Sequence, residues 1–194
     1  MSELKVVLCY TGDFTFSEKI LTRLQNDFSG VQFLEIKKDG YSTEVLNKAD
    51  VFMGWPDDEM IDIMENLKWL QLPSAGADRY IKHPGLDDNV ILTNSSGVFD
   101  VPGAEHVIAF MTAFARQLKL HIKQQDKHIW KRNPECLEIQ DSTVAVVGLG
   151  SIGSETAKKI KGLGAEIIGI KRDISSKPSY VDELYTSDSI NEVL

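Results

Sequence analysis

The chain has 194 residues, 42% of them hydrophobic and 26% charged, proportions that are ordinary for a soluble globular protein. A net charge of −8 without any basic stripe argues against a nucleic-acid partner. No apolar stretch approaches the roughly 18 residues of a membrane span and no signal-peptide pattern is visible, so we expect no membrane partner and a cytoplasmic location. Two cysteines, Cys9 and Cys136, cannot build a disulfide framework or a thiol metal cluster, and we expect no metal.

The first half of the chain alternates short apolar runs with longer mixed segments. Segments 16–28 and 57–65 are long enough to form helices that cross over between strands. This alternation predicts a parallel sheet covered on both faces, so residues 1–100 are interpreted as one α/β domain. The predicted strands cover residues 5–10, 31–36, 51–53, 69–72 and 90–92.

The pattern changes at residues 100–105, where we predict the start of one long helix that continues to Ile122. Apolar residues recur there at steps of three and four, and Phe110 and Phe114 add a second apolar face. A helix that is apolar on two sides has to bury both of them. We expect it to link two domains and to contribute to a subunit interface; burial within a single chain is the alternative. The first face comprises Val101, Ala104, Val107, Ile108, Met111, Ala115, Leu118 and Ile122.

A glycine-rich turn follows the apolar run 143–147 and opens an amphipathic stretch. Strand, glycine turn and helix in this order are typical of a dinucleotide-binding unit, with a purely structural turn as the alternative. The first glycine permits the tight turn, the second lets backbone approach a pyrophosphate, and the third lets the helix pack closely. The predicted cofactor-binding residues of the turn are Gly148, Leu149, Gly150, Ser151, Ile152 and Gly153.

The segment after this turn predicts the rest of the cofactor site. A stripe of Ile152, Thr156, Ile160 and Leu163 is expected to be buried, Gly164 is expected to end the helix, and residues 166–170 are predicted to form the next strand. Lys171 and Arg172 then precede Asp173. An acidic residue at this point binds the ribose of NAD, whereas a cation accommodates the extra phosphate of NADP. The cofactor is therefore NAD or NADP; the two cations slightly favour NADP, unless they are solvated surface charges.

Several separated motifs together resemble the D-isomer-specific 2-hydroxyacid dehydrogenases. They are residues 71–78, 92–94 and 97–106, then Arg116, Trp130 and the glycine turn. The resemblance implies a flavodoxin-like substrate domain in residues 1–100. It implies that residues 101–194 hold an interdomain helix and an incomplete Rossmann-type NAD(P)-binding domain. It also implies hydride transfer between the cofactor and a small 2-keto or 2-hydroxy acid, and a homodimer.

The resemblance also assigns individual residues. Ser74, Ala75, Gly76 and Ala77 match the segment whose backbone amides hold the substrate carboxylate; an ordinary tight turn is the alternative. Structural hydrogen bonding is the preferred interpretation for three further matching residues, Asn94, Glu105 and His106. Trp130 is expected to be a packing residue rather than a substrate contact.

The catalytic Arg, Glu and His segments of the family have no counterpart in the chain. Every histidine, namely His83, His106, His121 and His128, precedes the glycine turn. We therefore assign no catalytic residue and expect a C-terminally truncated dehydrogenase that is inactive by itself. The alternative is a noncatalytic dinucleotide-binding or interaction protein derived from the family. Because residues 143–147 and 166–170 read as central strands with an unpaired edge, we expect a homodimer or a larger assembly.

Overall fold

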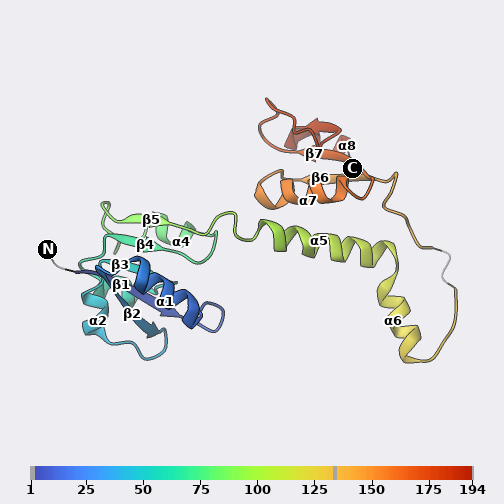
Figure 1. Ribbon diagram of the computed structural model, residues 1–194. Coiled ribbons are helices and arrows are strands. Elements are labelled where there is room, and N and C mark those ends of the chain that lie inside the picture. The colour runs from blue at the N-terminus through green and yellow to red at the C-terminus, as the bar shows by residue number, and fades with distance from the viewer. Residues whose placement is uncertain (1–2, 133–134, 194) are drawn as a thin grey trace. The chain divides into compact units, whose positions relative to one another are not determined.

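The computed structural model describes residues 3–132 and 135–193 and divides the chain into two compact units, Met1–Ser96 and Gly97–Leu194 (Figure 1). Each unit is described by itself.

The first unit is built on a five-stranded sheet in the order β2-β1-β3-β4-β5, in which every neighbouring pair is parallel. This is the strand order of flavodoxin-like doubly wound folds. The predicted fold class is confirmed, and each predicted strand lies within one residue of an observed one. The strands are β1 (Leu4–Tyr10), β2 (Val31–Lys37), β3 (Val51–Met53), β4 (Trp69–Gln71) and β5 (Ile91–Thr93).

Helices cover both faces of this sheet because the central strands are apolar on both sides. In β1, Val7 and Cys9 belong to one core cluster, while Val6 and Leu8 belong to another. The first cluster includes side chains of α2, α3 and α4, and the second includes Leu21 of α1. Alternate residues of a strand point to opposite faces, so one apolar run supplies two cores. The crossover helices are α1 (Glu18–Asp27), α2 (Thr43–Asn47), α3 (Asp58–Ile63) and α4 (Asp78–Ile81).

The second unit begins with two helices, α5 (Asp100–Ala115) and α6 (Leu118–Asp126), where one continuous helix was predicted. The prediction is wrong because Gln117 adopts a left-handed conformation with φ of 51°. This residue interrupts the helical hydrogen-bond ladder, and the Ala115 carbonyl instead accepts the N–H of Leu137 at 2.8 Å.

A three-stranded parallel sheet in the order β6-β7-β8 completes the second unit. The strands β6 (Thr143–Val147) and β7 (Glu166–Ile170) have the predicted bounds, with α7 (Ser151–Lys161) between them. Read from β8 to β6, the order corresponds to the first half of a Rossmann-type sheet. The unit ends with β8 (Glu183–Tyr185), a 3₁₀ turn η1 (Ser187–Ser189) and α8 (Ile190–Val193).

The core of the second unit lies between α7 and its sheet. Thr156 and Ile160 of the predicted stripe are buried, but Leu163 and Ile152 are 41% and 43% exposed, so the stripe is narrower than predicted. The helix ends at Lys161, three residues before Gly164, which follows in a left-handed conformation. One face of α5 packs on this core through Ile108 and Met111, whereas Phe110 and Phe114 on the second face stay exposed.

No helix in the described part of the chain is long and apolar enough to cross a membrane.

Candidate functional site

The glycine turn between β6 and α7 is fixed to the neighbouring strand at its first residue. The N–H of Gly148 donates to the carbonyl of Ile170, the last residue of β7, at 2.8 Å. Gly148 itself has φ of 95°, a left-handed conformation that a residue with a side chain rarely adopts. The turn therefore starts at the carboxyl edge of two adjacent parallel strands.

The other two glycines of the turn have opposite surroundings. A Cβ atom on Gly153 would lie 1.9 Å from the carbonyl oxygen of Gly148, so no other residue fits this position without moving the backbone. A Cβ atom on Gly150 would meet nothing within 4 Å. Gly153 is thus required by the turn itself, whereas the missing side chain of Gly150 leaves the outer surface of the turn free for a close approach.

The start of α7 presents backbone donors without a competing carboxylate. In the described residues, no acceptor meets the N–H groups of Leu149, Gly150, Ser151, Ile152 or Gly153. The first turn of α7 contains no acidic residue, while Lys158, Lys159 and Lys161 occupy its last turn. Free amides and the positive end of a helix together favour an anion such as a phosphate.

Leu149, the second residue of the turn, anchors it to the sheet. Its Cδ1 atom would lie 2.5 Å from a Cβ on Gly169 in the middle of β7, so the side chain fills the space that this glycine leaves open. Val181 and Leu184 border the same space. Leu149 is accordingly a packing residue rather than a solvent-facing one, and its packing fixes the position of the turn relative to β7.

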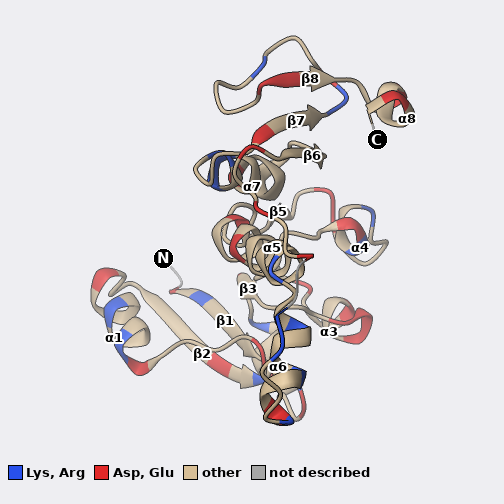
Figure 2. Cartoon of the chain, turned by 90° about the vertical axis from the view of Figure 1, so that its right-hand side faces the viewer, with Lys and Arg blue, Asp and Glu red and all other residues tan. Residues whose placement is uncertain are grey.

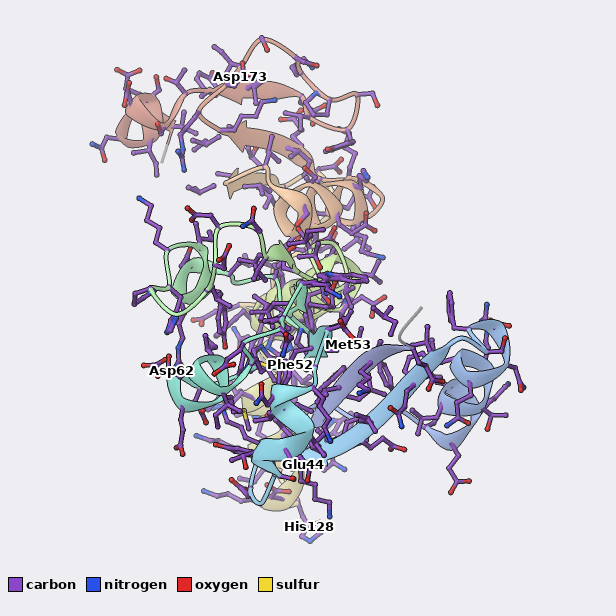
Figure 3. The ribbon with its side chains drawn as sticks, turned by 90° about the vertical axis from the view of Figure 1, so that its left-hand side faces the viewer. Glu44, Phe52, Met53, Asp62, His128 and Asp173 are labelled. Carbon is purple, nitrogen blue, oxygen red and sulfur yellow. The ribbon has the colours of Figure 1, made fainter. Side chains whose placement is uncertain are left out.

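The predicted selectivity residues follow directly after β7. Lys171 and Arg172 form the basic segment beyond the end of β7 in Figure 2. Asp173, the next residue, is labelled in Figure 3. The Lys171 ammonium donates to the carbonyl of Ser176 at 2.9 Å, whereas Arg172 has no hydrogen bond or ion pair to any described residue. Hydrogen bonds from Ser175 hold the pKa of the Asp173 carboxyl below its usual value, which keeps this group charged.

In the first unit, the loop 74–77 follows β4, and all of its first three carbonyl groups are occupied. The Ser74 carbonyl accepts the N–H of Ser95 at 3.1 Å, and the Ala75 carbonyl accepts the side-chain amide of Asn94 at 2.6 Å. The Gly76 carbonyl accepts the Ser74 hydroxyl at 3.3 Å. Asn94 thus has the structural role that the sequence indicated.

These contacts leave the opposite side of the same peptide groups free. Across the residues that the structure describes, the N–H groups of Ala75, Gly76 and Ala77 meet no acceptor, and Ala75 and Gly76 are exposed. Peptide planes whose carbonyls are fixed also have fixed N–H directions. The loop therefore offers a preorganised set of amide donors to an external anion.

A residue that the sequence analysis did not single out, Trp55, also holds this loop. Its indole N–H donates to the hydroxyl oxygen of Ser74 at 2.9 Å. Trp55 lies two residues beyond Met53, the last residue of β3, which Figure 3 labels. A tryptophan in a Gly-Trp-Pro segment directly after a buried strand is the sequence signal that could have drawn attention to it.

Comparison with known proteins agrees with this geometry. Residues 108–194 match the family model for the D-isomer specific 2-hydroxyacid dehydrogenase, NAD binding domain. A solved D-isomer specific 2-hydroxyacid dehydrogenase family protein from Aeromonas salmonicida superposes with a TM-score of 0.82 over 99% of the chain, at 23% identity. That likeness shows the fold. Residues 108–194 thus resemble the NAD binding domain of the D-isomer specific 2-hydroxyacid dehydrogenase family.

Two curated proteins are similar to longer parts of the chain. A D-lactate dehydrogenase from Streptococcus pyogenes is 24% identical over 189 residues, which cover 91% of the chain and 53% of that protein. A D-3-phosphoglycerate dehydrogenase from Archaeoglobus fulgidus is 28% identical over 122 residues, 62% of the chain and 23% of that protein. The chain therefore spans about half, or less, of the length of these relatives, and 61% of the length of the Aeromonas structure.

Other residues of the family resemblance have contacts of their own. In the second unit, Glu105 pairs with Lys159 at 3.9 Å and His106 packs edge-on against Phe110. Trp130 is fully exposed, so the expectation that it packs is wrong. It borders a hollow of about 860 Å³ beside α6, which Arg116 also lines and no residue of the glycine turn does.

Proposed function

We propose that this chain is the substrate-carboxylate and pyrophosphate-binding part of an NAD(P)-dependent D-2-hydroxyacid dehydrogenase. A bound nicotinamide supplies or accepts the hydride at C2 of a small 2-keto or 2-hydroxy acid. The observation that carries this proposal is the lack of room for a Cβ atom at Gly153 beside the carbonyl of Gly148, because a turn of this shape requires a glycine there. We assign Met1–Ser96 to the substrate domain and Gly97–Leu194 to the cofactor domain.

The residues of the glycine turn fit a pyrophosphate. Their amides from Leu149 to Gly153 have no acceptor among the described residues, the start of α7 carries no acid, and Gly150 leaves its outer side open. We infer that these amides hold the pyrophosphate, while the packing of Leu149 on β7 keeps the turn in place. A phosphate at such a position gains both hydrogen bonds and the favourable end of the helix dipole.

The loop 74–77 fits a carboxylate. Three peptide groups with fixed carbonyls present their N–H groups to the outside, and their residues are small enough for a ligand to approach the backbone. We infer that Ala75, Gly76 and Ala77 donate to the substrate carboxylate and that Ser74 positions them. These donors orient the 2-keto acid and do not themselves transfer a proton.

We propose a modest preference for NADPH. Arg172 carries a full positive charge, has no partner among the described residues and stands two residues beyond β7, where the ribose 2′-phosphate of NADP lies in such folds. Lys171 adds charge at the same place, although its ammonium is held by Ser176. Asp173 opposes them, but its carboxylate is turned to the N–H of Ser175.

We also propose that the 194-residue chain by itself does not oxidise NADH or NADPH with glyoxylate, pyruvate or hydroxypyruvate. Proton transfer to the substrate needs a general acid near the carbonyl oxygen, and all four histidines precede the glycine turn in sequence. Turnover above a buffer blank, tracking the protein through purification, contradicts this.

The exposed apolar side of α5 and α6 supports a homodimer or larger assembly. Phe110 and Phe114 stack at 6.5 Å between ring centroids and remain 53% and 78% exposed. Surfaces of this kind are usually covered by a partner. Light scattering at micromolar concentration is expected to report at least twice the 21.7 kDa chain mass. The buried Cys9, which is in no disulfide, suits a reducing compartment such as the cytoplasm.

Isothermal titration with NADH and NADPH tests the central proposal. We expect binding of both, tighter for NADPH, and a reversed preference in Lys171→Asp. Equal affinities that the substitution does not change would show that these cations only face solvent. Dinucleotide binding without any 2-keto acid binding at residues 75–77 would favour the alternative, a noncatalytic dinucleotide-binding protein, while no dinucleotide binding would contradict both.

A further inference from the structure

The start of α7 packs against α5 as well as against the sheet. Ile152, the second residue of α7, directs its side chain at Gly103 in the first turn of α5. A Cβ atom on Gly103 would lie 3.2 Å from Cγ2 of Ile152, 3.4 Å from Cδ1 and 3.6 Å from Cγ1. Ile152 is 43% exposed, but its inner side thus fills the space that this glycine leaves open.

The backbone of α5 does not itself require a glycine at position 103. Gly103 lies within the helix without a positive φ, and its N–H donates to the carbonyl of Phe99 at 2.9 Å. Alanine is more favourable than glycine in such a backbone. The space around the residue gives a different answer, because a Cβ at 3.2 Å from Cγ2 of Ile152 is closer than the roughly 3.5–4.0 Å of carbon atoms in optimal contact.

Two of the six residues of the glycine turn carry large apolar side chains, and each packs on a glycine of a neighbouring element. Leu149 packs on Gly169 of β7, and Ile152 packs on Gly103 of α5. The turn is thus fixed on one side by the sheet and on the other by α5. Because the N–H of Ile152 is one of the free amides at the start of α7, its side-chain contact bears directly on the direction of these donors.

An atom added at Gly103 has to displace Ile152 rather than α5. Further along α5, Ile108 and Met111 pack on the core cluster that contains Ile160 of α7, and Figure 1 shows α5 and α7 lying along each other. Movement of α5 would disturb this core. The Ile152 side chain cannot readily rotate away, since a β-branched residue in a helix has one strongly preferred rotamer. The displacement therefore passes to the backbone at the start of α7.

We propose that Gly103 is a positioning residue for the pyrophosphate of the cofactor. By leaving room for Ile152 it sets the direction of the amide donors at the start of α7, and it contacts no ligand itself. This inference rests on the proposed function, since it takes the amides from Leu149 to Gly153 as the pyrophosphate site.

The test titrates the ¹⁵N-labelled full chain with NADPH and follows the backbone amides of residues 149–153 by NMR. We expect Gly103→Ala to bind NADPH about fivefold more weakly, as when the contribution of one hydrogen bond is lost. Its free energy of unfolding, measured by chemical denaturation, should not fall, because alanine is the better helix former. Weaker binding at unchanged stability is an effect that a merely structural role of Gly103 would not produce.

A compensating variant shows whether Gly103 acts through Ile152. Ile152→Ala alone is expected to weaken NADPH binding, because the start of α7 loses its contact with α5. The double variant Gly103→Ala, Ile152→Ala exchanges the sizes of the two residues, and its affinity is expected to return to within about twofold of the parent. Gly162→Ala is the matched control, since its Cβ would also lie 3.2 Å from the nearest atom, the Lys159 carbonyl oxygen, but at the carboxyl end of α7. It should leave the affinity unchanged.

The outcomes distinguish this inference from the function on which it rests. If NADPH shifts the amides of residues 149–153 but Gly103→Ala binds it as tightly as the parent, Gly103 does not position the turn and only the pyrophosphate site stands. A double variant that binds no better than Gly103→Ala, or an equal loss of affinity in Gly162→Ala, also overturns the inference. If NADPH shifts none of these amides in the parent chain, the proposed pyrophosphate site is wrong and this inference with it.

Discussion

The glycine turn and the loop 74–77 both offer backbone N–H groups to an anion, but they reach that state in different ways. The shape of the turn depends on positions without a side chain. Gly153 has no room for a Cβ beside the carbonyl of Gly148, and Gly148 itself adopts a left-handed conformation. The loop is shaped by what is present, because Asn94, Ser95 and the Ser74 hydroxyl each occupy one of its carbonyls.

This difference teaches where each region is vulnerable. Steric shaping fails when an atom is added, whereas hydrogen-bonded shaping fails when a partner is removed. Substitutions that enlarge glycines should therefore damage the second unit, and substitutions that shorten polar side chains should damage the first.

The largest effect is expected for Gly153→Ala. The added Cβ would stand 1.9 Å from a backbone oxygen, so either α7 or the turn has to move, and we expect the second unit to lose about 3 kcal/mol of its free energy of unfolding. Chemical denaturation measures this loss, and titration with NADPH should show no remaining binding.

Gly150→Ala is the matched control within the same turn. Its Cβ would meet no atom within 4 Å, so stability should stay unchanged while the affinity for NADPH falls. Equal stability of Gly153→Ala and Gly150→Ala would contradict the steric account of the turn, because its shape would then not depend on its third glycine.

A smaller effect is expected for Gly169→Ala in β7. The new Cβ would lie 2.5 Å from Cδ1 of Leu149, but a side-chain end can shift more easily than backbone, so the cost should be about 1–2 kcal/mol. The double variant Gly169→Ala, Leu149→Ala should recover part of this loss because the clashing atom is gone. A double variant less stable than both single variants would argue against this contact.

The fold could largely be predicted from the sequence because its strands are apolar on both faces and bounded by polar segments. The third strand of the second unit was missed, since β8 has only three residues and begins with the acidic Glu183. The break between α5 and α6 was missed as well. Periodicity continues through Gln117, and the left-handed conformation of this residue depends on tertiary contacts such as the Ala115–Leu137 bond.

For the candidate site, sequence predicts glycine positions better than hydrogen-bond partners. A glycine turn after a strand has a fixed spacing, so Gly148, Gly150 and Gly153 can be read directly. Trp55 meets Ser74 across 19 residues, and such a long-range side-chain contact has no signature in local spacing.

Asn94→Ala tests the hydrogen-bonded loop. Removal of the 2.6 Å bond to the Ala75 carbonyl should cost about 1 kcal/mol and weaken the binding of pyruvate about fivefold, because the Gly76 N–H, which shares the peptide plane of this carbonyl, loses its fixed direction. The comparison variant is Asn66→Ala, which also loses an exposed side-chain bond to a carbonyl, that of Asn47, and should leave this affinity unchanged. An unchanged affinity in Asn94→Ala would show that the loop keeps its shape without this contact.

The smallest effect is expected for Gly76→Ala, and it makes the contrast between the two regions sharpest. Gly76 does not have a positive φ, and a Cβ there would meet no atom within 4 Å, so the folded loop has no need of a glycine at this position. The free energy of unfolding of Gly76→Ala, measured by thermal unfolding, should stay within about 0.5 kcal/mol of that of the parent, as for most surface substitutions. Gly148→Ala, at φ of 95°, should cost roughly 1 kcal/mol. Because the fold is unaffected, any loss of 2-keto acid affinity in Gly76→Ala measures how closely the carboxylate approaches the backbone. A destabilised Gly76→Ala would instead mean that the loop, like the turn, is shaped by the absence of a side chain.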